Sequence, residues 1–170
     1  VTISPVFDAL GTIVAASKIA RDITEQVEAI RLSHEYRAIV ESSEDAIYSV
    51  SLDGTITSWN NGAEHIFGFS ASDILGKSIS LLFDDDDQQA DHILRKIKHH
   101  ESLEHYKTTR KNRDGLVINV SETVSPLQDQ TGTVIGGSII ARNITHDMQA
   151  QQLIWKQANY TKPLFRRHLK

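Results

Sequence analysis

Carboxylates and histidines are the side chains of this sequence whose types and spacing could bind a metal or take part in catalysis. Four aspartates follow one another from Asp84 to Asp87, and hard cations such as Ca²⁺ are bound by oxygen ligands of this kind. A calcium loop spaces its ligands and carries a glycine at its sixth position, which this run lacks. We therefore interpret the run as a solvated loop before a helix, because carboxylates favour helix N-termini. We predict no metal site.

Catalytic arrangements are also missing from the sequence. The eight histidines include no pair four residues apart, and no serine, histidine and aspartate stand in a nucleophile-elbow context. A phosphate-cradling Gly-x-x-x-x-Gly-Lys motif does not occur, and the absence of cysteine excludes disulfides and thiolate chemistry. We expect a chain that is not itself an enzyme.

Composition limits the surroundings in which the chain can work. The 170 residues carry a net charge of -4, so no net basic field attracts nucleic acid. No apolar run approaches the ~18 residues of a membrane span, and the first residues show no signal-peptide pattern. We expect a cytoplasmic protein that binds no nucleic acid and has no membrane segment in this chain.

An internal repeat organises the chain. Residues 1–24 align without gaps with residues 122–145 at an offset of 121, and twelve of the twenty-four positions are identical. The repeat unit has the length of one small domain. We therefore predict that residues 1–23 are the C-terminal hairpin of a preceding domain and that one complete copy follows.

Turn signals and hydrophobic periodicity predict the secondary structure. Asp53-Gly54, Asp114-Gly115 and Thr131-Gly132 mark turns between β-rich runs. The predicted strands are 46–51, 55–60, 104–111, 116–127 and 133–143, and the predicted helices are 24–41, 61–66, 70–75, 88–99 and 147–159. This order predicts an α+β fold, a five-stranded antiparallel sheet with short helices on one face.

Two long stretches, DGTITSWNNGAEHIFGFSASDILGKSI and RKNRDGLVINVSETVSPLQDQTGTVIGGSIIARNIT, resemble a PAS sensory domain, and the resemblance covers residues 36–145. It implies a PAS fold at residues 42–145, between a linker helix at 24–41 and an output helix at 146–160. In this family an Asp/Asn-Ile-Thr turn joins the last strand to the output helix. The matching signal hinge residues are Asp22, Thr24, Asn143, Ile144 and Thr145.

The resemblance also implies a small apolar pocket between the sheet and the helices. Its candidate lining residues are Ile47, Ile56, Trp59, Phe67, Phe69, Leu82, Ile93, Ile97, Tyr106, Val120 and Ile139. Most of these side chains are expected to be simple core, and a few to contact a ligand.

Haem and flavin are the cofactors that this family suggests. The helix that carries His92 supplies the haem ligand in haem-binding members, but the spacing around His92 does not match, and the residue is turned about 100° from Ile93. The photoreceptor branch needs a reactive cysteine, which this chain lacks. An FAD stacked on Trp59 is the remaining alternative, although such an aromatic is more often core. We predict no cofactor.

The C-terminal residues LIWKQANY and PLFRRHLK resemble the entry to a GGDEF diguanylate cyclase domain, which would begin within residues 161–170. The Asp-x-Leu-Thr loop and the Asn-Arg of such entries are missing here. We expect a sensory and dimerisation module that regulates a cyclic-di-GMP enzyme. The alternatives are a PAS module of a sensor histidine kinase and a structural dimerisation spacer without a ligand.

Apolar stripes on the two flanking helices favour a parallel homodimer. The stripe of the first helix contains Ile23, Val27 and Ile30. The stripe of the second contains Ile144, Met148, Gln152 and Trp155. Isolated helices of this length are marginal in water, so partner contact would stabilise them. The alternative is that each helix folds back on its own sheet. Besides a second copy, the expected partners are a downstream output domain and an unidentified small-molecule ligand.

Overall fold

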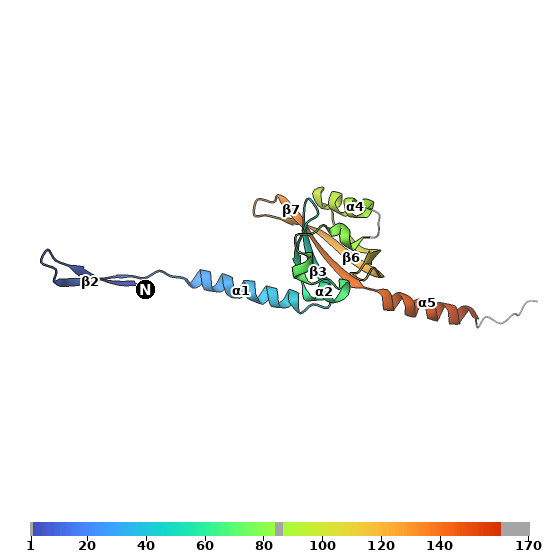
Figure 1. Cartoon of the computed structure of the whole chain (residues 1–170), viewed down its shortest axis with the longest axis horizontal. Coiled ribbons are helices and arrows are strands. Elements are labelled where there is room, and N and C mark those ends of the chain that lie inside the picture. The colour runs from blue at the N-terminus through green and yellow to red at the C-terminus, as the bar shows by residue number, and fades with distance from the viewer. Residues whose placement is uncertain (1, 84–86, 161–170) are drawn as a thin grey trace, which may run out of the picture. The chain divides into compact units, whose positions relative to one another are not determined.

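The structure is a computed structural model that describes residues 2–83 and 87–160, and it divides into two units, Val1–Ile39 and Val40–Lys170 (Figure 1). Each unit is described by itself. None of the helices in the described ranges is both long enough and apolar enough to cross a membrane.

The first unit contains a β-hairpin and most of a helix. Strands β1 (Thr2–Phe7) and β2 (Ile13–Ile19) pair antiparallel as a two-stranded sheet, and helix α1 spans Thr24–Glu41. The Asp8 carboxylate closes the turn by accepting the backbone N–H groups of Leu10 (2.8 Å) and Thr12 (2.9 Å).

The second unit contains the five-stranded sheet that the sequence predicts. Its elements are β3 (Ala46–Ser51), β4 (Ile56–Trp59), α2 (Asn61–Phe67), α3 (Ala71–Ile74), the 3-10 helix η1 (Ile79–Leu82), α4 (Asp87–Lys98), β5 (Leu103–Lys111), β6 (Val117–Gln128), β7 (Val134–Asn143) and α5 (Thr145–Tyr160). The strand order is β4-β3-β7-β6-β5, and all neighbours are antiparallel. The predicted α+β class is confirmed, whereas η1 was not predicted, because one turn of 3-10 helix has no periodicity to recognise.

The core lies between this sheet and its helices, with α2 against β3 and α4 against β6 and β7. Alternate residues of the central strands are buried, including Tyr48 on β3, Val124 on β6 and Ile139 on β7. Helix α4 packs closely because β7 carries glycine at position 137. A Cβ atom on Gly137 would lie 2.3 Å from Cδ1 of Ile97, so a larger residue would push the helix off the sheet.

The two hairpins of the repeat have the same backbone pairing. Thr2 pairs with Ile19 as Thr123 pairs with Ile140, and both hairpins shift register before their last pair. The turns match as well, because Asp129 accepts the backbone N–H groups of Thr131 (2.8 Å) and Thr133 (3.0 Å) as Asp8 does in β1–β2. In the second unit this hairpin belongs to a sheet of five strands, whereas β1 and β2 form a sheet of two.

The Asn60 side chain links the residues before and at the start of β3 to helix α2. Its Oδ1 accepts the N–H groups of Ile47 and Ala63, both at 2.8 Å, and so caps α2. Its Nδ2 donates to the carbonyls of Val40 (2.9 Å) and Asp45 (3.1 Å). The side chain is buried, so these bonds satisfy groups that water does not reach.

We expect Asn60→Ala to lower the free energy of unfolding by about 2–3 kcal/mol, because it removes a helix cap and leaves buried backbone groups unpaired. Urea denaturation followed by circular dichroism measures the change. Ser70→Ala is the matched control, because Ser70 also caps a helix but its hydrogen bond to Asp73 is exposed to solvent. This variant should lower the free energy of unfolding by less than about 1 kcal/mol. Equal losses in the two variants would contradict the central role of Asn60.

Candidate functional site

The predicted pocket residues lie mostly in one apolar core. Eight of the eleven are buried in it: Ile56, Trp59, Phe67, Leu82, Ile93, Ile97, Val120 and Ile139. Phe69 and Tyr106 are half-buried. Ile47 belongs to the other face of the sheet, because it alternates with the buried residues Ala46 and Tyr48 and pairs with Ile140. The apolar core therefore contains eight of the predicted residues, and Phe69 packs against it.

Three aromatic rings form the part of this core next to α2. The ring centroid of Tyr48 lies 5.1 Å from that of Trp59 and 6.0 Å from that of Phe67, and the last two are 5.5 Å apart. Trp59 donates its indole N–H to the carbonyl of Phe69 at 3.0 Å. The indole is held by neighbours on both its apolar and its polar side, so Trp59 functions as core in this structure.

A buried ion pair lies in the same interior, and sequence reasoning missed it. Arg110 on β5 donates from a terminal guanidinium nitrogen to Oε2 of Glu122 on β6 at 2.5 Å, and both side chains are fully buried. Arg110 also donates to the carbonyl of Thr109 at 2.7 Å, and its guanidinium lies 4.0 Å above the ring of Phe83. The sequence did contain a signal, since Glu122 alternates with Val120 and Val124 and must share their inward face.

The ion pair is costly to bury and is not fully satisfied. Among the described residues, Nε of Arg110 and Oε1 of Glu122 have no hydrogen-bond partner. Burial raises the pKa of the Glu122 carboxyl, although the charge and hydrogen bond of Arg110 act in the opposite direction. Burial, and then the negative charge of Glu122, also raise the pKa of Tyr48. An apolar pair of similar volume would avoid the free-energy cost of removing two charges from water. The charged pair instead gives the core a polar, titratable centre.

The residues predicted as the signal hinge lie between β7 and α5 and form hydrogen bonds with Asn119 of β6 and with each other. The N–H of Ile144 donates to the carbonyl of Asn119 (2.9 Å), and the hydroxyl oxygen of Thr145 accepts the N–H of Asn119 (3.0 Å). Asn143 Oδ1 accepts the N–H of Thr145 at 3.0 Å. In the first unit Asp22 accepts the N–H of Thr24 in the same way, at 2.9 Å.

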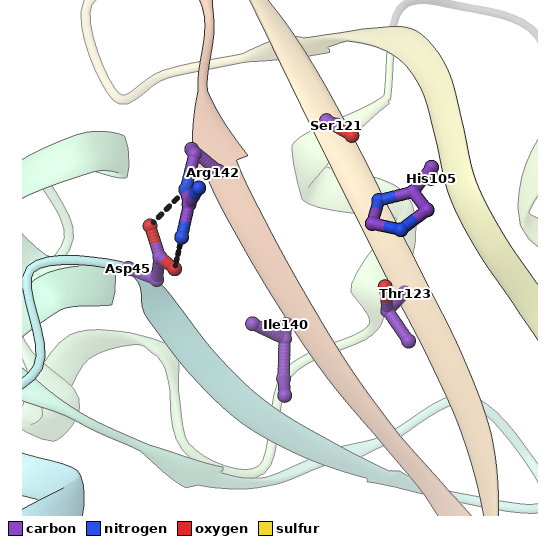
Figure 2. A pocket seen from close by; sticks show the side chains of 6 residues that line it. All are labelled: Asp45, His105, Ser121, Thr123, Ile140 and Arg142. Carbon is purple, nitrogen blue, oxygen red and sulfur yellow. Dashed lines mark hydrogen bonds and ion pairs between the residues drawn. The ribbon is translucent and has the colours of Figure 1, made fainter.

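The outer face of the sheet has a small polar hollow beside this hinge. Asp45 and Arg142 form a two-bonded ion pair, with distances of 3.0 Å and 2.8 Å between their nitrogen and oxygen atoms. Figure 2 shows the pair on one side of the hollow and His105 on the other, with Ser121 between them on β6. The volume is about 120 Å³.

His92 and the acidic run are the other candidates from the sequence. His92 is half-buried on α4, beside the buried Ile93. Within residues 2–83 and 87–160, no group of three His, Cys, Asp or Glu side chains could hold a metal ion. The aspartates 84–86 of the acidic run lie outside the described residues.

The raised pKa of Glu122 predicts a specific dependence of stability on pH. A carboxyl whose pKa is higher in the folded chain contributes stability below its unfolded pKa, and this contribution is lost as pH rises through the folded pKa. The unfolding free energy of the wild type, minus that of Glu122→Gln, should therefore fall as the pH rises above the ordinary pKa of a glutamate.

Guanidinium denaturation at several pH values tests this, with Glu101→Gln as the control. Lys96 lowers the pKa of the exposed Glu101, so the difference for that variant should have the opposite sign and be small. A wild type that gains stability over Glu122→Gln as pH rises would show that the attraction to Arg110 outweighs burial.

Comparisons with known proteins agree with this architecture. A family model described as the PAS fold matches residues 34–144. The PAS domain of a protein from Colwellia psychrerythraea is 20% identical, with a TM-score of 0.62, over 68% of this chain and 98% of that one. The PAS domain of an HTR-like protein from Haloarcula marismortui is 22% identical, with a TM-score of 0.62, over 72% of this chain and 100% of that one. These likenesses concern the fold alone.

A curated relative is larger than this chain. The signal transduction histidine-protein kinase AtoS of Escherichia coli (strain K12) is 24% identical over 136 residues, which are 79% of this chain and 22% of that protein. The chain thus spans about a fifth of the length of this relative. The family model, the sheet order and the solved neighbours lead to one conclusion: the chain belongs to the PAS family of signalling sensor domains.

Proposed function

We propose that this chain senses a signal in the interior of the PAS domain and passes it through the hinge to helix α5 and to an output domain. The observation that carries the proposal is that a single strand, β6, contacts both the interior and the hinge. Strand β6 places Glu122 in the polar centre of the core and, three residues earlier, Asn119 against the hinge. A shift of β6 would therefore reach both Ile144 and Thr145.

The mechanism needs two states that a signal can distinguish. A ligand, or a change in the charge of the Arg110–Glu122 pair, shifts the equilibrium only if it favours one state over the other. The unpaired Nε and Oε1 atoms make the pair the part of the core most sensitive to a polar ligand. Reordering of this centre would move β6 relative to β7, and α5 would follow.

The hinge contact can be tested with a substitution of nearly equal volume. Thr145→Val removes the oxygen that accepts the N–H of Asn119, which is worth about 1 kcal/mol and should speed exchange of this amide hydrogen about fivefold. Heteronuclear NMR measures the rate. Thr57→Val is the control, because its hydroxyl bonds to that of Ser49 on the exposed surface of the sheet, away from Asn119. Unchanged exchange at Asn119 would remove the hinge from the proposed route.

The same proposal includes a parallel homodimer through the flanking helices. The apolar stripe of α1 is exposed, with 54% of Val27 accessible, and so is that of α5, with 68% of Trp155 accessible. The two stripes begin at equivalent residues of the repeat, Ile23 and Ile144. A second copy would cover such stripes and align the two output domains side by side.

Size-exclusion chromatography with light scattering tests this assembly. Val27→Asp and Trp155→Asp should each weaken the dimer at least about tenfold, because each would place a carboxylate in an apolar seam. Gln26→Asp is the matched control on the adjacent helical position. A wild type that stays monomeric at high micromolar concentration would contradict the dimer and favour helices that cover their own sheet.

Two output domains remain candidates for the parent protein. The resemblance of the C-terminal residues to a GGDEF entry supports a diguanylate cyclase, although residues 161–170 lie outside the described structure. The similarity to a histidine kinase supports the second candidate. Both outputs consume nucleoside triphosphates, so we place the module in the cytoplasm.

The parent protein would decide between these outputs. A cyclase output predicts conversion of GTP to cyclic-di-GMP, and a kinase output predicts transfer of labelled phosphate from ATP to the protein. Thr145→Val in the parent should alter whichever activity is present, because it loosens the hinge that precedes the output domain.

A further inference from the structure

The hollow on the outer face of the sheet has a composition that the sensory core does not explain. It is formed by residues of four strands or strand ends: Asp45 before β3, Ile140 and Arg142 on β7, Ser121 and Thr123 on β6, and His105 on β5 (Figure 2). Its volume of about 120 Å³ is too small for an ordinary cofactor and suits a group of a few atoms.

The strand register brings the polar side chains together. Ser121 is directly opposite Arg142, and Thr123 is directly opposite Ile140. Side chains of such cross-strand pairs have Cβ atoms about 5 Å apart. Ile140 forms the apolar part of the hollow, while both hydroxyl groups face the same side of the sheet as Arg142.

His105 reaches the hollow because of an irregularity in β5. The register shifts between Leu103 and Tyr106, and His105 has a φ of 50°, which is uncommon for a residue with a side chain. This bulge directs the imidazole over β6, beside Ser121 and Thr123 (Figure 2). Within the described residues, no side-chain hydrogen bond involves His105, Ser121 or Thr123.

Most polar groups that line the hollow can donate a hydrogen bond to a ligand. Asp45 contributes the hollow's carboxylate, and both of its oxygens already accept bonds from Nε and one terminal nitrogen of Arg142. This pair holds the guanidinium in place and leaves its other terminal nitrogen unused by Asp45. A fixed guanidinium, two hydroxyls and an imidazole around a small space are complementary to an oxyanion.

We propose that this hollow binds a small oxyanion, that is, a phosphate or carboxylate group, between Arg142, Ser121, Thr123 and His105. The site is distinct from the interior, since it lies on the opposite face of the sheet. Arg142 immediately precedes the hinge residue Asn143, and Asp45 immediately precedes β3. An anion that binds Arg142 therefore acts on the ion pair that ties the entry of the domain to its exit.

The test is an NMR titration of the isotope-labelled chain with sodium phosphate and, separately, with sodium acetate, each at constant ionic strength set by sodium chloride. We expect saturable shifts of the backbone amides of Ser121, Thr123 and Arg142 with at least one of the two anions. The arm that saturates identifies whether the group is tetrahedral or planar.

Two variants and one control locate the binding site. Arg142→Gln should weaken binding at least about tenfold, because it removes the charge-assisted bonds. His105→Gln should weaken it a few-fold and leaves the Asp45–Arg142 pair intact, so it reports on the site even if Arg142→Gln unfolds the chain. Ser138→Ala is the control, since Ser138 faces the same side of the sheet opposite Ser125 and does not line the hollow.

Three outcomes would overturn the proposal. Shifts that do not saturate with either anion would do so, and so would equal affinities in the wild type and His105→Gln. Shifts that appear only together with a doubling of the mass in light scattering would show instead that a second copy of the chain covers the hollow.

Discussion

A charged pair inside an otherwise apolar core is the interaction on which the rest of this domain depends. Arg110 and Glu122 lie on neighbouring strands, and neither reaches solvent. Because a buried charge without its partner costs several kcal/mol, the two side chains restrict how β5 and β6 can be aligned and what can cover them. The guanidinium also lies over the ring of the buried Phe83, so the same pair helps to position the residue directly after η1.

The proposed route of the signal through β6 starts from this pair. Strand β6 contacts α4 and pairs with β5 and β7, and its Asn119 holds the first residues of α5. A core of hydrocarbon alone would respond to little except a change in volume. A core with a titratable, incompletely bonded centre can also respond to a polar ligand, and Asn119, which bonds to Ile144 and Thr145, lies three residues from Glu122 on the same strand.

The internal repeat is also visible in the structure. Hairpin β1–β2 reproduces the pairing, the turn and the capped helix start of β6–β7 and α5. The two equivalent threonines differ in their hydrogen-bond partners: the hydroxyl oxygen of Thr145 accepts a bond from the N–H of Asn119, whereas the hydroxyl of Thr24 donates to Asp22 within its own turn. We propose that the partner strands of β1 and β2 belong to a preceding PAS domain, and that α1 is its output helix as α5 is the output helix of this one.

The sequence alone determined the type of each long element and the α+β class, because periodicity, Gly-containing turns and the repeat are local signals that the residues carry directly. Tertiary structure decided which face each strand presents. Ile47 fits an apolar pocket by composition, yet its place in the alternation of β3 puts it on the outer face. Arg110 and Glu122 are twelve residues apart and meet only because β5 and β6 pair. The outer hollow needs residues from Asp45 to Arg142 and a bulge at His105, and no local pattern predicts contacts across that distance, since they depend on the register of the whole sheet.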